Sequence, residues 1–334
     1  MTPSLDALYD NALIWDNHAC PPRENTLDFM SVLDRYHAAG VDVVGLNIGD
    51  SNVPLEELVR QAAHIRLYLD ENPARYCLVR STAEITGAKA CGRTAVLLNV
   101  EGSYALNGQA GLIPVLFDIG VRWMAMVYNS ATAVGYGVHD PDDHGLTAFG
   151  RTVVAEMDRV GIIKCCSHTG YRTALDVFNA TSRPTIFSHS NPRALRDHPR
   201  NIPDELIKAC AATDGVIGIN GVGIFLGDND IRSETIVRHI DYVAQLVGVR
   251  HVGLGLDYVF NQREMDAALA LHGGIWPPAF GYRPGVKFAP PEQIREIAGA
   301  LRTLGYGDDD IKGVLGANLL RVAEQVWPCA PPLC

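Results

Sequence analysis

The chain has 334 residues, of which 47% are apolar and 20% are charged, and its formal net charge is −10. This size and composition are those of a globular protein, and we expect residues 1–334 to form a single domain. The acidic balance provides no basic surface for nucleic acid or for an anionic membrane. The sequence has no run of about 20 apolar residues, and it begins without a basic and apolar leader. We therefore expect a cytoplasmic protein.

Eight short apolar runs recur along the chain. They are rich in Val, Ile and Leu, and they show little alternation between apolar and polar residues. Parallel strands that are covered on both faces have this pattern. The runs are ALIWDNH (12–18), VDVVGLNIG (41–49), TAVLLNVEG (94–102), RWMAMVYN (122–129), GIIKCCSH (161–168), PTIFSHS (184–190), GVIGING (215–221) and HVGLGLD (251–257).

Helical patterns fill most of the gaps between these runs. A strand and helix unit that is repeated eight times predicts a (β/α)8 barrel of the TIM type, with a C-terminal helical extension. The alternative is a doubly wound open sheet. No Gly-rich phosphate loop follows any run, which disfavours the nucleotide-binding form of that alternative. Apolar residues at helical spacing occur in segments 26–40, 55–72, 145–161, 202–215 and 233–248.

Each apolar run ends in a polar residue. In a barrel, the carboxyl ends of all strands meet at one rim, where active sites lie. A single polar residue at such an end can simply begin a loop, but three histidines and two carboxylates at one rim indicate a shared site. The residues are His18, Asn47, Glu101, Tyr128 with Asn129, His168, His189, Asn220 and Asp257.

Imidazole and carboxylate groups together suit Zn²⁺ or a similar divalent ion. Glu101 lies between His18 and the pair His168 and His189 in barrel order, so we expect it to bridge two ions. Asp257, on the last strand, is then free to act as a general base. The alternative role for Asp257 is that of a hydrogen-bonded loop carboxylate.

Several segments resemble those of the membrane (renal) dipeptidase family of zinc peptidases, which are amidohydrolase-like barrels. The resemblance covers residues 12 to about 323, and the segments occur in the same order and at similar spacing. The combination of IFSHS and RNIPDE is specific to this family. The segments are WDNHAC, LLNVEG, SHTG, IFSHSNPRAL, HPRNIPDE, HVGLGLDY and GANLLRV.

The resemblance implies a site with two zinc ions. His18 and the residue at position 20 hold one ion together with Glu101, which also holds the other ion with His168 and His189. Asp257 matches the acid and base of the family. Arg200 matches the arginine that receives the substrate carboxylate, a role that suits a fork-shaped cation, and the alternative is a surface ion pair. We also expect Tyr128, Asn129 and Tyr258 to contact the substrate.

Two residues depart from the family pattern. Cys20 stands where the family has an aspartate. It can bind zinc as a thiolate, leave the first site weak or empty, or be oxidised, and we favour a weakened first site. Cofactor content is therefore expected to be one or two zinc ions. Tyr128 stands where a histidine often stabilises the transition state, and its hydroxyl can still donate to a developing oxyanion.

The resemblance implies hydrolysis of dipeptides by metal-activated water, with a D residue accepted at the C-terminal position. The first alternative is hydrolysis of another peptide-like molecule, such as a modified amino acid, an amide or a lactam. A non-catalytic homologue is disfavoured, because burying so many polar groups costs stability. The resemblance also implies a homodimer. Segment 259–290 is expected to cover the site with Trp276, Phe280 and Tyr282, or else to pack as a surface loop.

Overall fold

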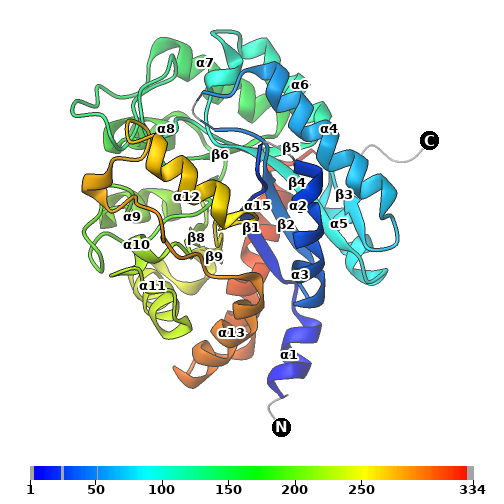
Figure 1. Cartoon of the computed structure of the whole chain (residues 1–334). Helices are drawn as coiled ribbons and strands as arrows, with labels where there is room; N and C mark the ends of the chain where they lie inside the picture. Colours follow the sequence, from blue (N-terminus) through cyan, green and yellow to red (C-terminus); the bar gives the residue numbers. More distant parts are fainter. Residues whose placement is uncertain (1–3, 24–25, 51, 329–334) are drawn as a thin grey trace.

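The computed structural model describes residues 4–23, 26–50 and 52–328. Parallel strands form a barrel that is surrounded by helices (Figure 1). The strands pair in the order β7-β6-β5-β4-β2-β1-β9-β8, and a bridge between Phe187 and Ile217 joins the two ends of this series. The predicted TIM-type fold is confirmed. The barrel strands are β1 (Trp15–Cys20), β2 (Val43–Asn47), β4 (Thr94–Val100), β5 (Val121–Ala125), β6 (Ile163–Cys165), β7 (Thr185–Ile186), β8 (Ile217–Ile219) and β9 (Val252–Leu254).

Two further short strands lie beside this barrel. Strand β3 (Tyr76–Leu78) pairs with β4, and strand β10 (Tyr258–Val259) pairs with the end of β1. The sequence did not predict β3, which has only three residues and is partly exposed. Strand β10 directly follows Asp257 and therefore begins at the rim.

The helices pack around the barrel, and each predicted helical segment contains one. Segment 26–40 is divided by a 3-10 turn at Met30–Val32. No helix in the described ranges has the length and apolar character needed to cross a membrane. The helices are α1 (Leu5–Asn11), α2 (Thr26–Phe29), α3 (Leu33–Ala38), α4 (Leu55–Glu71), α5 (Thr82–Ala90), α6 (Ile113–Ile119), α7 (Ala148–Val160), α8 (Tyr171–Ala180), α9 (Asp204–Ala212), α10 (Gly223–Leu226), α11 (Ser233–Val247), α12 (Gln262–Leu271), α13 (Ile294–Thr303), α14 (Asp308–Lys312) and α15 (Asn318–Val326).

Helix α7 shows how local chemistry sets the helix ends. The Thr147 hydroxyl accepts a hydrogen bond from the Gly150 amide and caps the first turn. Gly161 ends the helix in a left-handed conformation with φ of 90°, where a Cβ atom would lie 2.6 Å from Pro328 Cδ. The chain then turns directly into β6.

Helix α15 closes the end of the barrel opposite the rim. Its residues Leu319 and Val322 share a buried cluster with Trp15 and Val43, which are the first residues of β1 and β2. Close approach is needed here, because a Cβ atom on Gly316 would lie 2.4 Å from the Leu13 carbonyl oxygen. The amino ends of the strands are thus filled by apolar side chains, and the carboxyl ends remain available for polar ones.

Candidate metal centre

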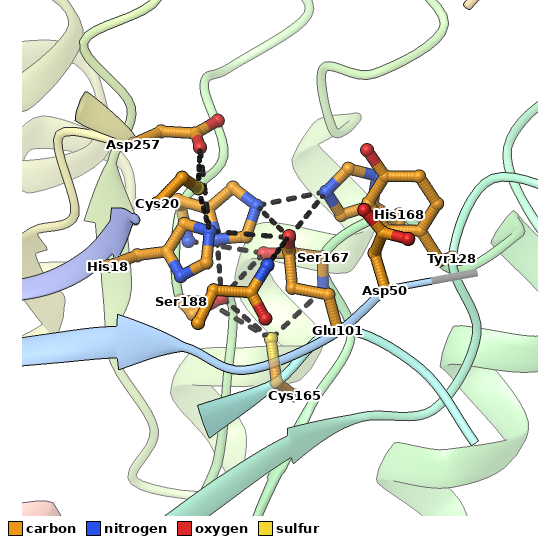
Figure 2. Close-up of polar contacts among 12 residues, drawn as sticks. His18, Cys20, Asp50, Glu101, Tyr128, Cys165, Ser167, His168, Ser188 and Asp257 are labelled. Atoms are coloured by element: carbon orange, nitrogen blue, oxygen red, sulfur yellow. Dashed lines mark hydrogen bonds and ion pairs between the residues drawn. The ribbon is translucent and has the colours of Figure 1, made fainter. Parts of the chain in front are cut away.

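Histidine and carboxylate side chains from five strand ends meet at the carboxyl rim of the barrel (Figure 2). Glu101 Oε1 lies 3.0 Å from His168 Nε2, 3.0 Å from His189 Nε2 and 3.4 Å from His18 Nε2. His18 Nε2 also lies 3.4 Å from Asp257 Oδ1. Glu101 and the three histidines are buried. The structure therefore brings together the five rim residues that the sequence selected for metal binding and acid–base chemistry.

Cys20 points into the same centre. Its Sγ atom lies 3.5 Å from His18 Nε2 and 3.5 Å from Asp257 Oδ1. Asp16, two residues before His18, does not point there. Its carboxylate accepts hydrogen bonds from the Leu256 amide at 2.8 Å and from the Tyr36 hydroxyl at 3.3 Å. Asp16 therefore holds the end of β9 against β1.

The donor atoms of this centre fit zinc. His18, Cys20 and Glu101 form one group whose donor atoms lie within 4.8 Å of one another, and Glu101, His168 and His189 form a second. Zinc binds nitrogen, oxygen and sulfur at about 2.0–2.3 Å in a tetrahedron, which places neighbouring donors roughly 3.3–3.8 Å apart. In addition, Glu101 Oε1 is buried and accepts no well-aligned hydrogen bond among the described residues. A cation is the partner that such an oxygen requires.

Burial and neighbouring charges both shift the pKa values of the ionisable groups in this centre. Burial opposes ionisation of Glu101, but the charge of His18 and the close approach of the other two imidazoles hold the Glu101 pKa well below its usual value. Burial raises the pKa of the Cys20 thiol, and the charges of Asp257 and Glu101 raise it further. Burial also raises the pKa of Asp257, whose Oδ2 accepts a hydrogen bond from Asn220 Nδ2 at 3.0 Å.

A chain of small polar side chains orients His189. Its Nδ1 atom lies 2.7 Å from the Ser188 hydroxyl, and the Cys165 thiol donates to the same hydroxyl at 3.0 Å. When Nδ1 carries the proton and donates it to Ser188, the lone pair of Nε2 points toward Glu101. Sequence reasoning missed Ser188, although it directly precedes His189 in IFSHS.

His168 has two competing partners. Its Nδ1 atom lies 2.7 Å from Asn129 Oδ1 and 3.0 Å from Arg200 Nε. A ring nitrogen either donates to the amide oxygen or accepts from the guanidinium, so both hydrogen bonds do not form in one tautomer. Donation to Asn129 leaves Nε2 free for a metal ion. Asn129 is thus a positioning residue for His168, and it lies outside the main cleft.

Three residues at this rim have left-handed backbone conformations. The φ angles are 55° for Asn129, 66° for His168 and 59° for Asp257. Such conformations are costly for residues other than glycine, and they concentrate at functional sites. Here they turn each side chain inward directly after its strand.

Tyr128 and Arg200 flank the centre. The Tyr128 ring stacks on His168 with 4.1 Å between centroids, and its hydroxyl accepts a hydrogen bond from Trp276 Nε1 at 3.0 Å. Arg200 is buried beside the histidines, where Nη2 donates to the His189 carbonyl oxygen at 3.0 Å and Nη1 to the Ser190 hydroxyl at 3.2 Å. Arg200 is therefore not a surface ion pair.

Tyr258 lies away from the centre. Its hydroxyl accepts a hydrogen bond from Arg35, and its ring packs near Tyr36. Its position gives no support to the expected contact between Tyr258 and a substrate.

A cleft opens from the centre to the surface. Cys20, Glu101, His168 and Asp257 lie at its polar end, next to Tyr128. Residues from segment 259–290 also line the cleft, including Trp276 and Tyr282, whereas Phe280 does not. Asp50, which sequence reasoning missed, lines the same cleft as Glu101 and Tyr128 (Figure 2) and forms an ion pair with Arg23 at 3.4 Å. Its signal in the sequence is an acidic residue directly after run 41–49.

Two known dipeptidases are similar in sequence. Dipeptidase aclJ of Aspergillus oryzae is 32% identical over 240 residues, which are 70% of this chain and 52% of that protein. Dipeptidase verJ of Clonostachys rogersoniana is 28% identical over 274 residues, which are 81% of this chain and 66% of that protein. The alignments thus span about half of the first relative's length and just under two thirds of the second's.

Two solved structures share the fold. An amidohydrolase from Pseudomonas aeruginosa has a TM-score of 0.87 at 26% identity, covering 97% of this chain and 99% of that one. A metallo peptidase from Rhodobacter sphaeroides has a TM-score of 0.79 at 20% identity, covering 95% of this chain and 99% of that one. A family model described as membrane dipeptidase (peptidase family M19) matches residues 50–266. Because this match covers more than half of the sequence, the chain belongs to the membrane dipeptidase family, peptidase family M19.

Proposed function

We propose that this protein is a zinc-dependent dipeptidase. The observation that carries the proposal is the position of Glu101 Oε1, which lies within 3.4 Å of three imidazole nitrogens at the end of a cleft that Asp257 also lines. Such a shared carboxylate suits two metal ions, and paired ions suit hydrolysis. Membership of the membrane dipeptidase family supports the same reaction.

Two groups of residues hold the metal in this proposal. His18, Cys20 and Glu101 form the first site, and Glu101, His168 and His189 form the second. Zinc bound there supplies Lewis acidity, which activates water and polarises a peptide carbonyl. All other steps rest on side chains of the chain itself.

Asp257 moves the proton in this reaction. Its Oδ1 atom faces the centre, and Asn220 fixes the other oxygen at 3.0 Å. Asp257 accepts the proton of the attacking water and then gives it to the leaving amine. Tyr128 has a different task. Because its hydroxyl oxygen accepts from Trp276, its own proton is free to donate to the oxyanion that develops on the peptide carbonyl.

Charged groups on two sides of the centre position the dipeptide. When His168 donates to Asn129, Arg200 Nε loses its acceptor at His168 and is available for the C-terminal carboxylate. The amino group of the substrate lies toward Asp50, which lines the cleft and whose partner Arg23 is about half exposed. The Arg23 side of this ion pair is open to water, which weakens the attraction, so an ammonium group in the cleft can compete for Asp50.

The stereochemistry and the assembly state are further parts of the proposal. The Rhodobacter sphaeroides structure is liganded with a phosphinate mimic of the dipeptide L-Ala-D-Ala. We therefore include dipeptides with a D residue at the C-terminal position among the proposed substrates. Homodimer formation and a cytoplasmic location stay predictions.

One observation favours a second candidate function. Cys20 places a thiol in the first metal group, where it lies 3.5 Å from both His18 and Asp257. A thiolate reduces the Lewis acidity of the bound ion compared with a carboxylate. This site would then suit an activated amide or a lactam, which needs less polarisation than an ordinary peptide bond.

A substrate panel separates the two candidates. The zinc-loaded protein is incubated with L,L and L,D dipeptides, with the same dipeptides as C-terminal amides, and with small lactams, and free amino acids are measured. The dipeptidase proposal predicts hydrolysis of the dipeptides and much slower hydrolysis of the amides, which lack the carboxylate that Arg200 binds. Lactam hydrolysis without dipeptide hydrolysis would overturn it in favour of the second candidate.

A further inference from the structure

One side of the cleft is a continuous apolar surface. Seven buried residues that line the cleft pack against one another in a cluster separate from the barrel core. One of them, Val222, directly precedes helix α10, and we call the other six the cleft wall. Four of them follow β9, and two belong to helix α10. Since these residues do not belong to the barrel core and line the cleft that contains Glu101 and His168, the cleft wall is a surface beside the metal centre. It consists of Ile224, Phe225, Leu269, Trp276, Tyr282 and Val286.

The cleft wall adjoins the carboxylate end of the site. The Arg200 guanidinium lies 5.7 Å from the centroid of the Phe225 ring, and the Tyr282 ring lies 5.9 Å from that of Phe225. Asp50 lies on the far side of the centre, because it follows β2, whereas α10 follows β8, and strands β1 and β9 separate the two. A dipeptide that places its carboxylate at Arg200 therefore has its C-terminal residue next to the cleft wall.

Tyr282 carries an unused hydrogen-bonding group at this place. Its side chain is 6% exposed, and its hydroxyl has no hydrogen-bond partner among the described residues. Burying a hydroxyl without a partner costs stability unless a ligand supplies the partner. Burial raises the pKa of Tyr282, and the charge of Arg200 opposes this rise. The Tyr282 hydroxyl therefore lies close enough to Arg200 to feel its charge. The neutral hydroxyl is a donor suited to a carboxylate.

We propose that the cleft wall and Tyr282 form a subsite for a C-terminal residue with a large apolar side chain. Tyr282 donates a hydrogen bond to the substrate carboxylate beside Arg200, and the side chain packs on Phe225 and Leu269. The preferred substrates are therefore dipeptides that end in residues such as leucine or phenylalanine. This inference rests on the proposed dipeptidase function.

The first test compares substrates. Values of kcat/KM are measured for Ala-Leu, Ala-Gly and Leu-Gly with the zinc-loaded enzyme. Ala-Leu should exceed both others by about tenfold or more, because each buried methylene adds to binding of the transition state. Equal values for Ala-Leu and Ala-Gly would overturn the subsite while leaving the dipeptidase function intact. Hydrolysis of none of the dipeptides would overturn the function and the subsite together.

The second test uses two pairs of variants. Tyr282→Phe removes one hydroxyl and should raise KM for Ala-Leu by about tenfold with little change in kcat, as expected for loss of a hydrogen bond to a charged group. Tyr242→Phe is the matched control, since its hydroxyl bonds to Asp204 away from the cleft. Leu269→Asn should lower the ratio of kcat/KM for Ala-Leu to that for Ala-Gly, whereas Leu271→Asn, on the same helix and 77% exposed, should not.

Zinc content and circular dichroism are measured for all four variants. If Leu269→Asn fails to fold, the conservative Tyr282→Phe variant still tests the subsite. An unchanged KM for Ala-Leu in a folded and metallated Tyr282→Phe protein would contradict the role given to Tyr282.

Discussion

The thiol sulfur of Cys20 lies 3.5 Å from Oδ1 of Asp257. The two side chains come from the first and last barrel strands and meet above His18, whose Nε2 lies 3.5 Å from the sulfur and 3.4 Å from the carboxylate oxygen. A residue proposed as a metal ligand is thus in contact with the residue proposed to move the proton. A substitution at position 20 should therefore affect both metal binding at the first site and proton transfer by Asp257.

Replacement of Cys20 by aspartate should strengthen the first metal site. A thiol must lose a proton before it binds zinc and supplies one donor atom, whereas a carboxylate is already ionised at neutral pH. We expect the unmodified protein to release one zinc ion to a chelator more readily than the other, and Cys20→Asp to hold both more equally. Competition with a chromophoric chelator measures the affinity of each zinc ion in the two proteins. Two equally tight ions in the unmodified protein would contradict the expectation.

Removal of the Ser188 hydroxyl should weaken the second metal site. Ser188→Ala leaves His189 Nδ1 without its partner at 2.7 Å. Loss of such a partner costs about 10–100-fold in metal affinity. Ser188→Thr keeps the hydroxyl and should restore binding. Zinc affinity and the visible spectrum of the cobalt-substituted protein are the measurements, and an unchanged affinity in Ser188→Ala would show that the hydroxyl does not orient His189.

The variant Asp257→Asn should retain zinc and lose turnover. The amide keeps the shape of the side chain but neither accepts nor returns a proton, so kcat should fall by about 10²–10⁴-fold. Asp228→Asn is the control, because the Asp228 side chain is 96% exposed and pairs only with a surface arginine, Arg196, in the described interactions. Comparable kcat values for the two variants would remove Asp257 from the mechanism.

Stability should fall in acid because of a histidine remote from the metal centre. Burial lowers the pKa of His239 from 6.5 to about 4, although its ring donates to the Leu226 carbonyl oxygen at 3.0 Å. In the unfolded chain, His239 therefore binds a proton below about pH 6.5. In the folded chain, it binds this proton only below about pH 4. The stability contributed by neutral His239 is present above pH 6.5 and is lost as pH falls through this window, by up to about 3 kcal/mol.

Urea unfolding at several pH values tests the role of His239. The free energy of unfolding of His239→Gln should depend less on pH between about pH 6.5 and pH 4 than that of the unmodified protein. Above pH 6.5, the difference in the free energy of unfolding between the two proteins should not change with pH. Identical pH dependence in both proteins would contradict the assignment.

The barrel and most of the centre could be predicted from the sequence because both depend on short-range patterns. Each apolar run becomes a strand, and parallel strands carry their final residues to one rim, so His18, Glu101, His168, His189 and Asp257 converge without any knowledge of the loops. The family resemblance then selected Arg200 and drew attention to Cys20.

The remaining features depend on contacts between distant segments. Asp50 reaches the centre through the path of the loop after β2, and Ser188 matters only because β7 places it between His189 and Cys165. No periodic pattern encodes such contacts. Tyr258 is a similar case, because its hydroxyl accepts a hydrogen bond from Arg35 of helix α3, which is distant in the sequence.

Zinc titration of the metal-free protein tests whether hydrolysis depends on metal bound at Glu101 and its three histidines. The protein is stripped of metal with a chelator, zinc is added in steps, and hydrolysis of Ala-Leu is measured at each step beside bound zinc. We predict no hydrolysis without metal and a hydrolysis rate that rises in step with the amount of bound zinc. Hydrolysis by the stripped protein, or none by the fully loaded protein on any dipeptide, would contradict it.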